Sequence, residues 1–155
     1  MFPTSVSPST DVLVVGAGPT GLTLTADLLR RGVRVRLVDR APAPATTSRA
    51  TSVTPRTLEV LDDLGIAQAL VDAGIPITTT EAVADGRPAF RASFPVTDVT
   101  RHPFLLNVSQ QRTEQELTAL VERLGGRVER GVALAGFRQD RDAVVSGLVG
   151  VDAVE

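Results

Sequence analysis

Three glycines near the start of the chain have the spacing that suits binding of a dinucleotide. Gly16, Gly18 and Gly21 fit the pattern G-x-G-x-x-G, between the apolar run of residues 11–15 and an amphipathic stretch that begins at Pro19. The first glycine permits a tight turn, the second lets the backbone approach a pyrophosphate, and the third allows close packing of a helix on a strand. The free N–H groups and the dipole of a helix N-terminus then favour the phosphates.

One carboxylate completes this pattern. Asp39 ends the second apolar run, close to the roughly 20-residue offset expected for the acid that binds a ribose. A carboxylate there accepts hydrogen bonds from ribose hydroxyls and repels a 2′-phosphate, while Pro19 and Thr20 begin the helix beside the phosphates. A glycine turn with only a structural role is the alternative. The pattern by itself does not separate FAD from NAD.

The elements that must position these residues form a strand, a helix and a second strand. The continuous apolar run of residues 11–15 predicts a strand buried on both faces, and Gly32 ends the helix that follows. In residues 33–38, Arg34 and Arg36 alternate with apolar residues, which favours a strand nearer the sheet edge than the first. The predicted fold class is therefore α/β, with a Rossmann-like βαβ core.

The rest of the chain alternates between helical and β patterns. Residues 1–10 are predicted to be a disordered lead-in and residues 41–53 an extended loop. An Asp85-Gly86 turn divides two alternating runs within residues 75–108, which predicts a small inserted β region. Three further helices are predicted: one starts at Pro55 and ends at Gly65, one spans residues 67–73, and one runs through Leu117 to Leu124. Residues 127–150 are predicted to form short strands with a turn at 140–142.

Composition excludes several classes of chemistry. The net charge is −2, all 16 basic residues are arginine, and there is no cysteine, tyrosine or tryptophan. Walker-type phosphate loops, Schiff bases and thiol catalysis are therefore excluded, and nucleic acid is not an expected partner. With a single histidine, His102, no metal centre is expected, and that residue is predicted to lie in a turn or at the surface. No apolar run is long enough to span a membrane and no signal peptide is evident, so we expect a cytoplasmic location.

Two further segments resemble a known family. The segment SRATSVTPRTLEVLDDLGI, residues 48–66, resembles the R-A-x-x-V-x-P-R-T-L-E-x-L-x-x-L-G stretch of FAD-dependent aromatic hydroxylases. LLNVSQQRTEQEL, residues 105–117, is similar to the P-Q-x-x-T-E-x-x-L stretch of the same proteins. These are flavoprotein monooxygenases of the para-hydroxybenzoate hydroxylase type, especially the polyketide-tailoring and phenol-hydroxylating branch. The order and separations match from Asp11 to about Gln139.

The resemblance implies roles for individual residues. The three glycines would pack on the FAD pyrophosphate, Asp39 would hold the adenosine ribose, and Arg40 would lie beside the adenine end. Arg49 would approach the flavin pyrophosphate in a charge-assisted contact. Gln110 would reach the ribityl and phosphate region, with Arg112 beside it. Solvated surface charges remain the alternative for Arg40 and Arg112.

The resemblance also implies an activity and a domain organisation. Such enzymes hydroxylate a small aromatic substrate with NAD(P)H as co-substrate and O2, and the cofactor supplies most of the chemistry. No catalytic residue is nominated in this chain. Residues 11–155 would be the N-terminal portion of an FAD-binding domain, with the β insertion of residues 75–108 on the substrate-domain side.

The last residues also resemble a family motif. Residues 148–153, L-V-G-V-D-A, are similar to L-V-G-A-D-G, which would make Asp152 the motif aspartate with Ala153 in place of glycine; a chance match is the alternative. Because family members are much longer, the sequence predicts a truncated FAD-binding portion that is not competent alone. Unpaired sheet edges would then favour self-association or a partner chain. The alternatives are a non-catalytic dinucleotide-binding or interaction module that needs a partner chain, and an NAD-dependent enzyme, for which no usual proton-transfer residue is present.

Overall fold

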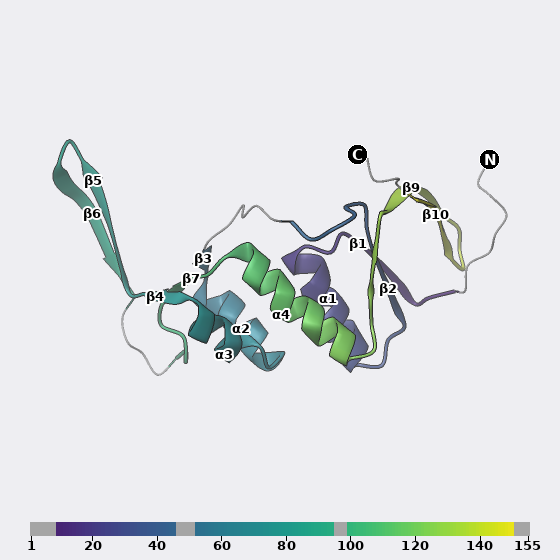
Figure 1. Cartoon of the computed structure of the whole chain (residues 1–155), viewed down its shortest axis with the longest axis horizontal. Coiled ribbons are helices and arrows are strands. Elements are labelled where there is room, and N and C mark those ends of the chain that lie inside the picture. The colour runs from purple at the N-terminus through teal and green to yellow at the C-terminus, as the bar shows by residue number, and fades with distance from the viewer. Residues whose placement is uncertain (1–8, 46–51, 95–98, 151–155) are drawn as a thin grey trace. The chain divides into compact units, whose positions relative to one another are not determined.

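The computed structural model describes residues 9–45, 52–94 and 99–150 in two compact units (Figure 1). The first unit comprises residues 1–46 and 117–155, and the second comprises residues 47–116. The predicted lead-in lies mostly outside the described residues, which begin at residue 9. Each unit is considered by itself.

A three-stranded parallel sheet forms the centre of the first unit. Its strands are β1 (Val12–Val15), β2 (Val35–Asp39) and β8 (Val128–Arg130), in the order β1-β2-β8. Helix α1 (Pro19–Arg30) connects β1 to β2, whose pairing is parallel. This confirms the predicted Rossmann-like βαβ core and α/β fold class, and it brings the carboxyl ends of the three strands to one edge.

Helix α1 begins and ends at the predicted residues. Pro19 occupies its first turn, where a missing N–H costs no hydrogen bond. At its other end Gly32 has a φ of +78°, a left-handed conformation that suits glycine. Leu22 and Ala26 are fully buried on the face of α1 that packs toward the core, which also contains Leu37 of β2. The apolar spacing of the helix therefore fixes which side of it faces the sheet.

The prediction that the strand of residues 33–38 lies nearer the sheet edge than that of residues 11–15 is wrong. In the described sheet β2 lies between β1 and β8, and Val38 is fully buried. The arginines that suggested an edge instead pair with acids of the segments on either side. Arg34 Nη2 lies 2.6 Å from Asp11 Oδ1, and Arg36 Nη2 lies 2.8 Å from Glu129 Oε2. The alternation of arginines with apolar residues in 33–38 therefore reflects ion pairs with neighbouring segments of the sheet.

The first unit is completed by an antiparallel hairpin and the end of a long helix. Strands β9 (Val132–Gln139) and β10 (Val144–Gly150) pair along their length. The Asp140 carboxylate accepts the backbone N–H groups of Asp142 and Ala143 at 3.0 and 2.9 Å, which confirms the predicted turn. Helix α4 (Gln110–Arg123) belongs to this unit from Leu117 onward and to the second unit before it.

Two short helices form the core of the second unit. Helix α2 (Pro55–Asp63) begins as predicted, because the Thr54 hydroxyl accepts the Thr57 N–H at 3.3 Å. Helix α3 (Ala67–Ala73) follows after a break at Gly65, whose φ is +76°. The buried residues of the two helices include Leu58, Leu61, Ala67 and Leu70.

The β region of the second unit contains a small sheet and a separate hairpin. The sheet has the order β3-β7-β4, from Ser52–Val53, Leu105–Asn107 and Ile75–Ile77. Strand β3 corrects the prediction of a loop as far as residue 53, because Ser52 and Val53 pair with β7. Strands β5 (Thr79–Ala84) and β6 (Arg87–Ser93) form the predicted hairpin around Asp85 and Gly86. Both turn residues have positive φ, as a type I′ turn requires.

Candidate nucleotide-binding site

The glycine turn between β1 and α1 is held in one conformation by contacts that only glycine permits. Gly16 has a φ of +103°, and its N–H donates to the carbonyl of Val38 at 2.8 Å. A Cβ added at Gly21 would overlap the carbonyl oxygen of Gly16, so α1 could not lie so close to the end of β1. The first and third glycines of the motif therefore fulfil the structural roles predicted for them.

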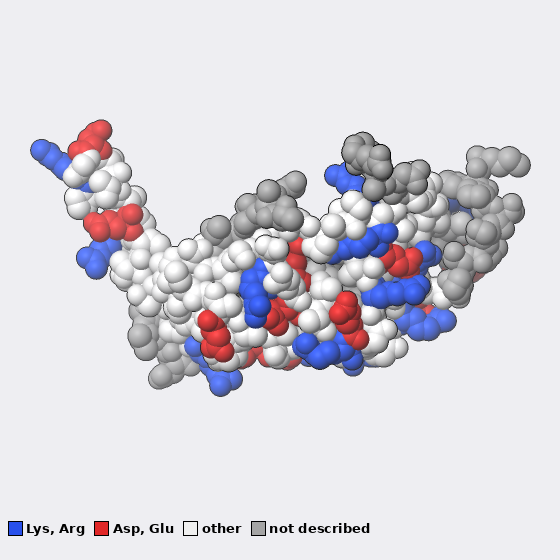
Figure 2. All heavy atoms as spheres, in the orientation of Figure 1, with Lys and Arg blue, Asp and Glu red and all other residues white. Residues whose placement is uncertain are grey.

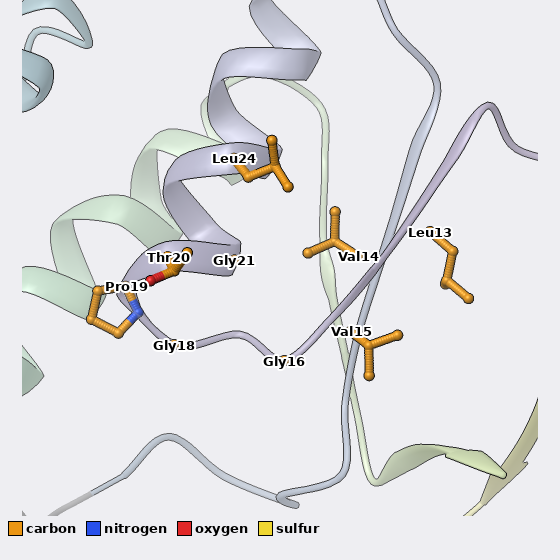
Figure 3. A pocket seen from close by; sticks show the side chains of 9 residues that line it. All are labelled: Leu13, Val14, Val15, Gly16, Gly18, Pro19, Thr20, Gly21 and Leu24. Atoms are coloured by element: carbon orange, nitrogen blue, oxygen red, sulfur yellow. The ribbon is translucent and has the colours of Figure 1, made fainter. Parts of the chain in front are cut away.

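A shallow groove of about 440 Å³ lies over this turn (Figure 3). In the close-up it follows the turn from the end of β1 to the first residues of α1. An added Cβ at Gly18 would meet no atom within 4 Å, so the backbone there is open to an approaching group. The residues that line the groove are Leu13, Val14, Val15, Gly16, Gly18, Pro19, Thr20, Gly21 and Leu24.

The electrostatics of the groove suit an anionic group. The first-turn N–H groups of an α-helix have no carbonyl of their own helix to bind, and Pro19 contributes none, which leaves those of Thr20 and Gly21. The first turn of α1 carries no acidic residue. The open backbone at Gly18 and the positive end of a 12-residue helix therefore fit a phosphate or diphosphate.

Asp39 lies at the same edge of the sheet and is tied to the glycine turn. Its Oδ2 accepts the N–H of Ala17 at 2.6 Å, and its Oδ1 accepts the N–H of Ala41 at 2.8 Å. The side chain is 15% exposed. A carboxylate has about four lone-pair positions, so these two bonds leave acceptor capacity for a ligand. The structure thus brings the predicted acid and the predicted glycine turn together.

Arg130 is a charged neighbour of Asp39 that no motif indicates. It ends β8, is paired in register with Asp39, and places its Nη1 3.4 Å from Asp39 Oδ2. The next residue, Gly131, donates its N–H to the carbonyl of Ala41 at 3.2 Å. The sequence offers one signal for Arg130, a short strand that ends in a charged residue followed by glycine. Its significance depends on knowing that this strand is parallel and neighbours β2.

The other predicted residues are not brought to this edge by the described contacts. Arg40 is exposed next to Asp39. Gln110 and Arg112 begin α4 in the second unit. Gln110 Nε2 donates to Glu114 Oε1 at 2.8 Å, and Arg112 Nη2 lies 2.6 Å from Glu116 Oε1. The predictions for Arg49 and Asp152 lie outside the described residues.

His102 lies outside the helices and strands, which agrees with a turn position, but the alternative prediction of a surface position is wrong. The residue is 9% exposed, and its ring meets the ring of Phe104 edge to face with centroids 5.9 Å apart. Its Nε2 lies 3.8 Å from Asp62 Oδ2. In the part of the chain that the structure describes, no three His, Cys, Asp or Glu residues are grouped so as to hold a metal ion.

Several charges elsewhere form ion pairs, among them Arg36 with Glu129 and Arg56 with Glu59. Figure 2 shows arginine interspersed with acidic side chains on the face that it draws. The guanidinium of Arg36 donates two hydrogen bonds to Glu129 and thereby lowers the pKa of that carboxyl below its usual value, against the opposing effect of burial. None of the described helices is long and apolar enough to cross a membrane.

Comparison with known proteins identifies the family. Residues 9–153 match the family described as FAD binding domain, and the chain belongs to it. The chain is 47% identical over 125 residues to 6-methylpretetramide 4-monooxygenase from Streptomyces rimosus, covering 80% of this chain and 22% of that protein. It is 38% identical over 138 residues to rifampicin monooxygenase from Streptomyces venezuelae, covering 89% and 28%. The chain therefore spans less than a third of the length of these relatives.

Solved structures agree with this assignment. The anhydrotetracycline hydroxylase OxyS from Streptomyces rimosus is 35% identical with a TM-score of 0.77, over 91% of this chain and 28% of that one. The flavin-dependent monooxygenase PieE, solved in complex with FAD and substrate, is 27% identical with a TM-score of 0.73, over 90% and 27%. These matches confirm the predicted fold class, the resemblance to aromatic flavin monooxygenases and the prediction of FAD as the family's cofactor. The geometry of the glycine turn fits the diphosphate of that cofactor.

Proposed function

We propose that this chain binds the adenosine diphosphate portion of FAD in a flavin-dependent monooxygenase that hydroxylates an aromatic substrate with NAD(P)H and O2. The observation that carries the proposal is the meeting of the glycine turn and Asp39 at one edge of the sheet. There Ala17 N–H and Asp39 Oδ2 are 2.6 Å apart. Such an edge, at the carboxyl ends of parallel strands, is where nucleotides bind in this class of fold.

The proposed roles follow the chemistry of each residue. Gly16, Gly18 and Gly21, with Pro19 and Thr20, would form the diphosphate cradle. Asp39 would accept hydrogen bonds from the ribose, with Arg40 at the adenine end. Arg49 and Asp152 are proposed as further FAD contacts from the sequence alone.

Gln110 and Arg112 are proposed to contact the flavin-bearing half of FAD. Both side chains are engaged by acids one turn further along α4, so binding would require them to exchange or share these partners. The β strands within residues 75–108 are proposed to belong to the substrate-domain side.

FAD, when bound, supplies the redox chemistry with oxygen, and the protein supplies binding and orientation. The activities named for the relatives, on 6-methylpretetramide and rifampicin, belong to proteins of which this chain covers 22% and 28%. We therefore expect no oxygen uptake from this chain alone with NADPH and a phenol. A cytoplasmic location remains a prediction from the sequence.

The proposal is tested by the absorption spectrum of the purified chain after incubation with FAD and desalting. A retained flavin band that 5′-ADP displaces supports binding through the adenosine half. Absence of saturable binding by both FAD and 5′-ADP contradicts the proposed function. Oxygen uptake in the same samples separately tests whether this chain has activity.

An interaction module is the second candidate, and one observation favours it. In the described sheet β1 has β2 on one side and an open edge on the other. Apolar side chains lie beside the groove next to it, where Val15 is 51% exposed and Leu24 is 46% exposed. Open edges and exposed apolar surface favour pairing with another strand. If this candidate is right, light scattering detects a dimer that Leu24→Gln weakens; a monomer at all concentrations tested contradicts self-association.

A further inference from the structure

Each of the three parallel strands ends in a group that faces the same edge of the sheet. Strand β1 ends at the glycine turn, β2 ends at Asp39, and β8 ends at Arg130. The first two are the expected parts of a nucleotide site, whereas Arg130 has no role in the proposed function so far. Its side chain is 20% exposed, so a guanidinium is held partly out of water beside the proposed ribose position.

We propose that Arg130 is the second recognition residue at the adenosine end, and that its pairing with Asp39 makes the site select a free 2′-hydroxyl over a 2′-phosphate. This inference rests on the proposed function and extends it. Asp39 alone would repel a 2′-phosphate, and Arg130 alone would attract one. Their proximity, with Nη1 3.4 Å from Oδ2, lets the carboxylate offset the charge of the guanidinium.

The geometry favours recognition of a ligand by the Asp39–Arg130 pair over a role limited to holding β2 and β8 together. Strands β2 and β8 already pair through Leu37, Val38 and Asp39 in register with Val128, Glu129 and Arg130. Arg36 and Glu129 add a second, shorter ion pair between the same strands at 2.8 Å. The Asp39–Arg130 contact is the long one of the two. It lies at the strand ends, where a ligand approaches, and not within the sheet.

The Asp39 carboxylate is also positioned to contact both Arg130 and a ligand. Backbone N–H groups of Ala17 and Ala41 hold Oδ2 and Oδ1 in place, so its orientation does not depend on the arginine. Arginine has five N–H donors, and one directed at Asp39 leaves others for a neighbouring oxygen. Removing the negative charge at residue 39 should therefore convert this end of the site into one that prefers a 2′-phosphate.

The test compares ADP-ribose with 2′-phospho-ADP-ribose by titration calorimetry on the full chain. We expect the wild type to prefer ADP-ribose by about tenfold or more, the scale of one charge-assisted hydrogen bond. Asp39→Asn should reverse the preference by about the same factor. In the double variant Asp39→Asn with Arg130→Gln, the gain for the 2′-phosphate should disappear. Arg127→Gln, at an arginine whose side chain is 84% exposed before β8, is the matched control and should change neither affinity.

The outcomes distinguish this inference from the proposed function. If the wild type binds neither nucleotide, the proposed function fails and the inference fails with it. If the wild type binds ADP-ribose but Asp39→Asn gains the same affinity for the 2′-phosphate with and without Arg130, only the inference is overturned. Thermal unfolding of each variant shows whether it folds. Should Asp39→Asn not fold, Arg130→Gln alone decides: a fivefold or larger change in the ratio of the two affinities supports the inference, and equal changes for both ligands overturn it.

Discussion

The two regions that the sequence marks for FAD differ in how their groups are held. At the glycine turn, segments far apart in the chain are joined by hydrogen bonds from backbone N–H groups, from Gly16 to the Val38 carbonyl and from Ala17 to the Asp39 carboxylate. At the start of α4, Gln110 and Arg112 instead pair with acids of the same helix. The turn is therefore preorganised for a ligand by the fold itself, whereas the α4 side chains must exchange partners to contact one. Preorganised groups contribute more to affinity because less freedom is lost on binding.

The largest effect on the glycine turn is expected from a substitution at Gly21. In Gly21→Ala the added methyl group would overlap the carbonyl oxygen of Gly16 and force α1 away from β1. We expect the free energy of unfolding to fall by about 3 kcal/mol, the upper part of the usual range for overpacking, and binding of 5′-ADP to be lost. Denaturant unfolding and calorimetry measure the two effects.

Gly136→Ala in β9 is the control for this change, because an added Cβ there meets no atom within 4 Å. It should leave 5′-ADP binding unchanged and alter stability by less than about 0.5 kcal/mol. Wild-type affinity for 5′-ADP in Gly21→Ala would show that close packing of helix and strand is not what forms the cradle.

A change at Gln110 tests the proposed flavin contact at the start of α4. As proposed, this side chain contacts the flavin-bearing half of FAD, so Gln110→Ala should weaken FAD by about tenfold, the value of one or two hydrogen bonds in a partly buried site. Binding of 5′-ADP should stay within about twofold of wild type. Paired titrations with the two ligands measure the difference. A parallel loss for both would place Gln110 at the adenosine half or assign it a structural role.

An ion pair between β2 and β8 makes the stability of the first unit depend on acid pH. Arg36 lowers the pKa of Glu129 below its ordinary value of 4.5, so the pair stabilises the fold fully above that value. This contribution is lost as the pH falls through the lowered pKa of the folded state. Between pH 7 and pH 3 the wild type should lose about 1 kcal/mol more than Glu129→Gln, as expected for one partly buried ion pair.

Urea unfolding at each pH measures this difference. Glu122→Gln, at an exposed position of α4, controls for the removal of one carboxylate. Identical acid dependence of the wild type and Glu129→Gln would show that the pair between β2 and β8 does not contribute to stability.

The smallest effect is expected in the β5–β6 hairpin, which belongs to the second unit and contains no residue of the glycine turn. Phe90 is 63% exposed, so Phe90→Ser removes little buried apolar surface. The free energy of unfolding should change by less than about 0.5 kcal/mol, with 5′-ADP binding unchanged. A loss of more than 2 kcal/mol would show that the ring is covered in solution, and concentration-dependent stability would then identify self-association as the cause.

Local signals predicted most of the fold because they act within a few residues. Proline and glycine set the ends of α1, the Thr54 hydroxyl begins α2, and Asp85-Gly86 closes the β5–β6 hairpin. Strand order could not be predicted in the same way, because it depends on which segments meet. Residues 33–38 were expected near the edge since their arginines look solvent-facing, yet Arg36 pairs with Glu129 of a strand distant in sequence.

The residues of the candidate site likewise divide into those that local sequence predicts and those that only the pairing of distant segments reveals. The glycine motif and Asp39 could be predicted because their spacing along the chain carries the chemistry. Arg130 could not be, because it joins the site only through the parallel pairing of β8 with β2. The burial of His102 likewise depends on its packing against Phe104 and near Asp62, which the surrounding TRHPF sequence does not indicate.

The turn between β1 and α1 is proposed to bind a nucleotide diphosphate through its backbone. Titration with 5′-ADP, followed by NMR at the amide N–H resonances of the chain, measures this binding residue by residue. We expect saturable shifts at Gly18, Thr20 and Gly21, while the resonances of β5 and β6 stay unchanged. The absence of saturable shifts at the turn, or shifts confined to other segments, would contradict it.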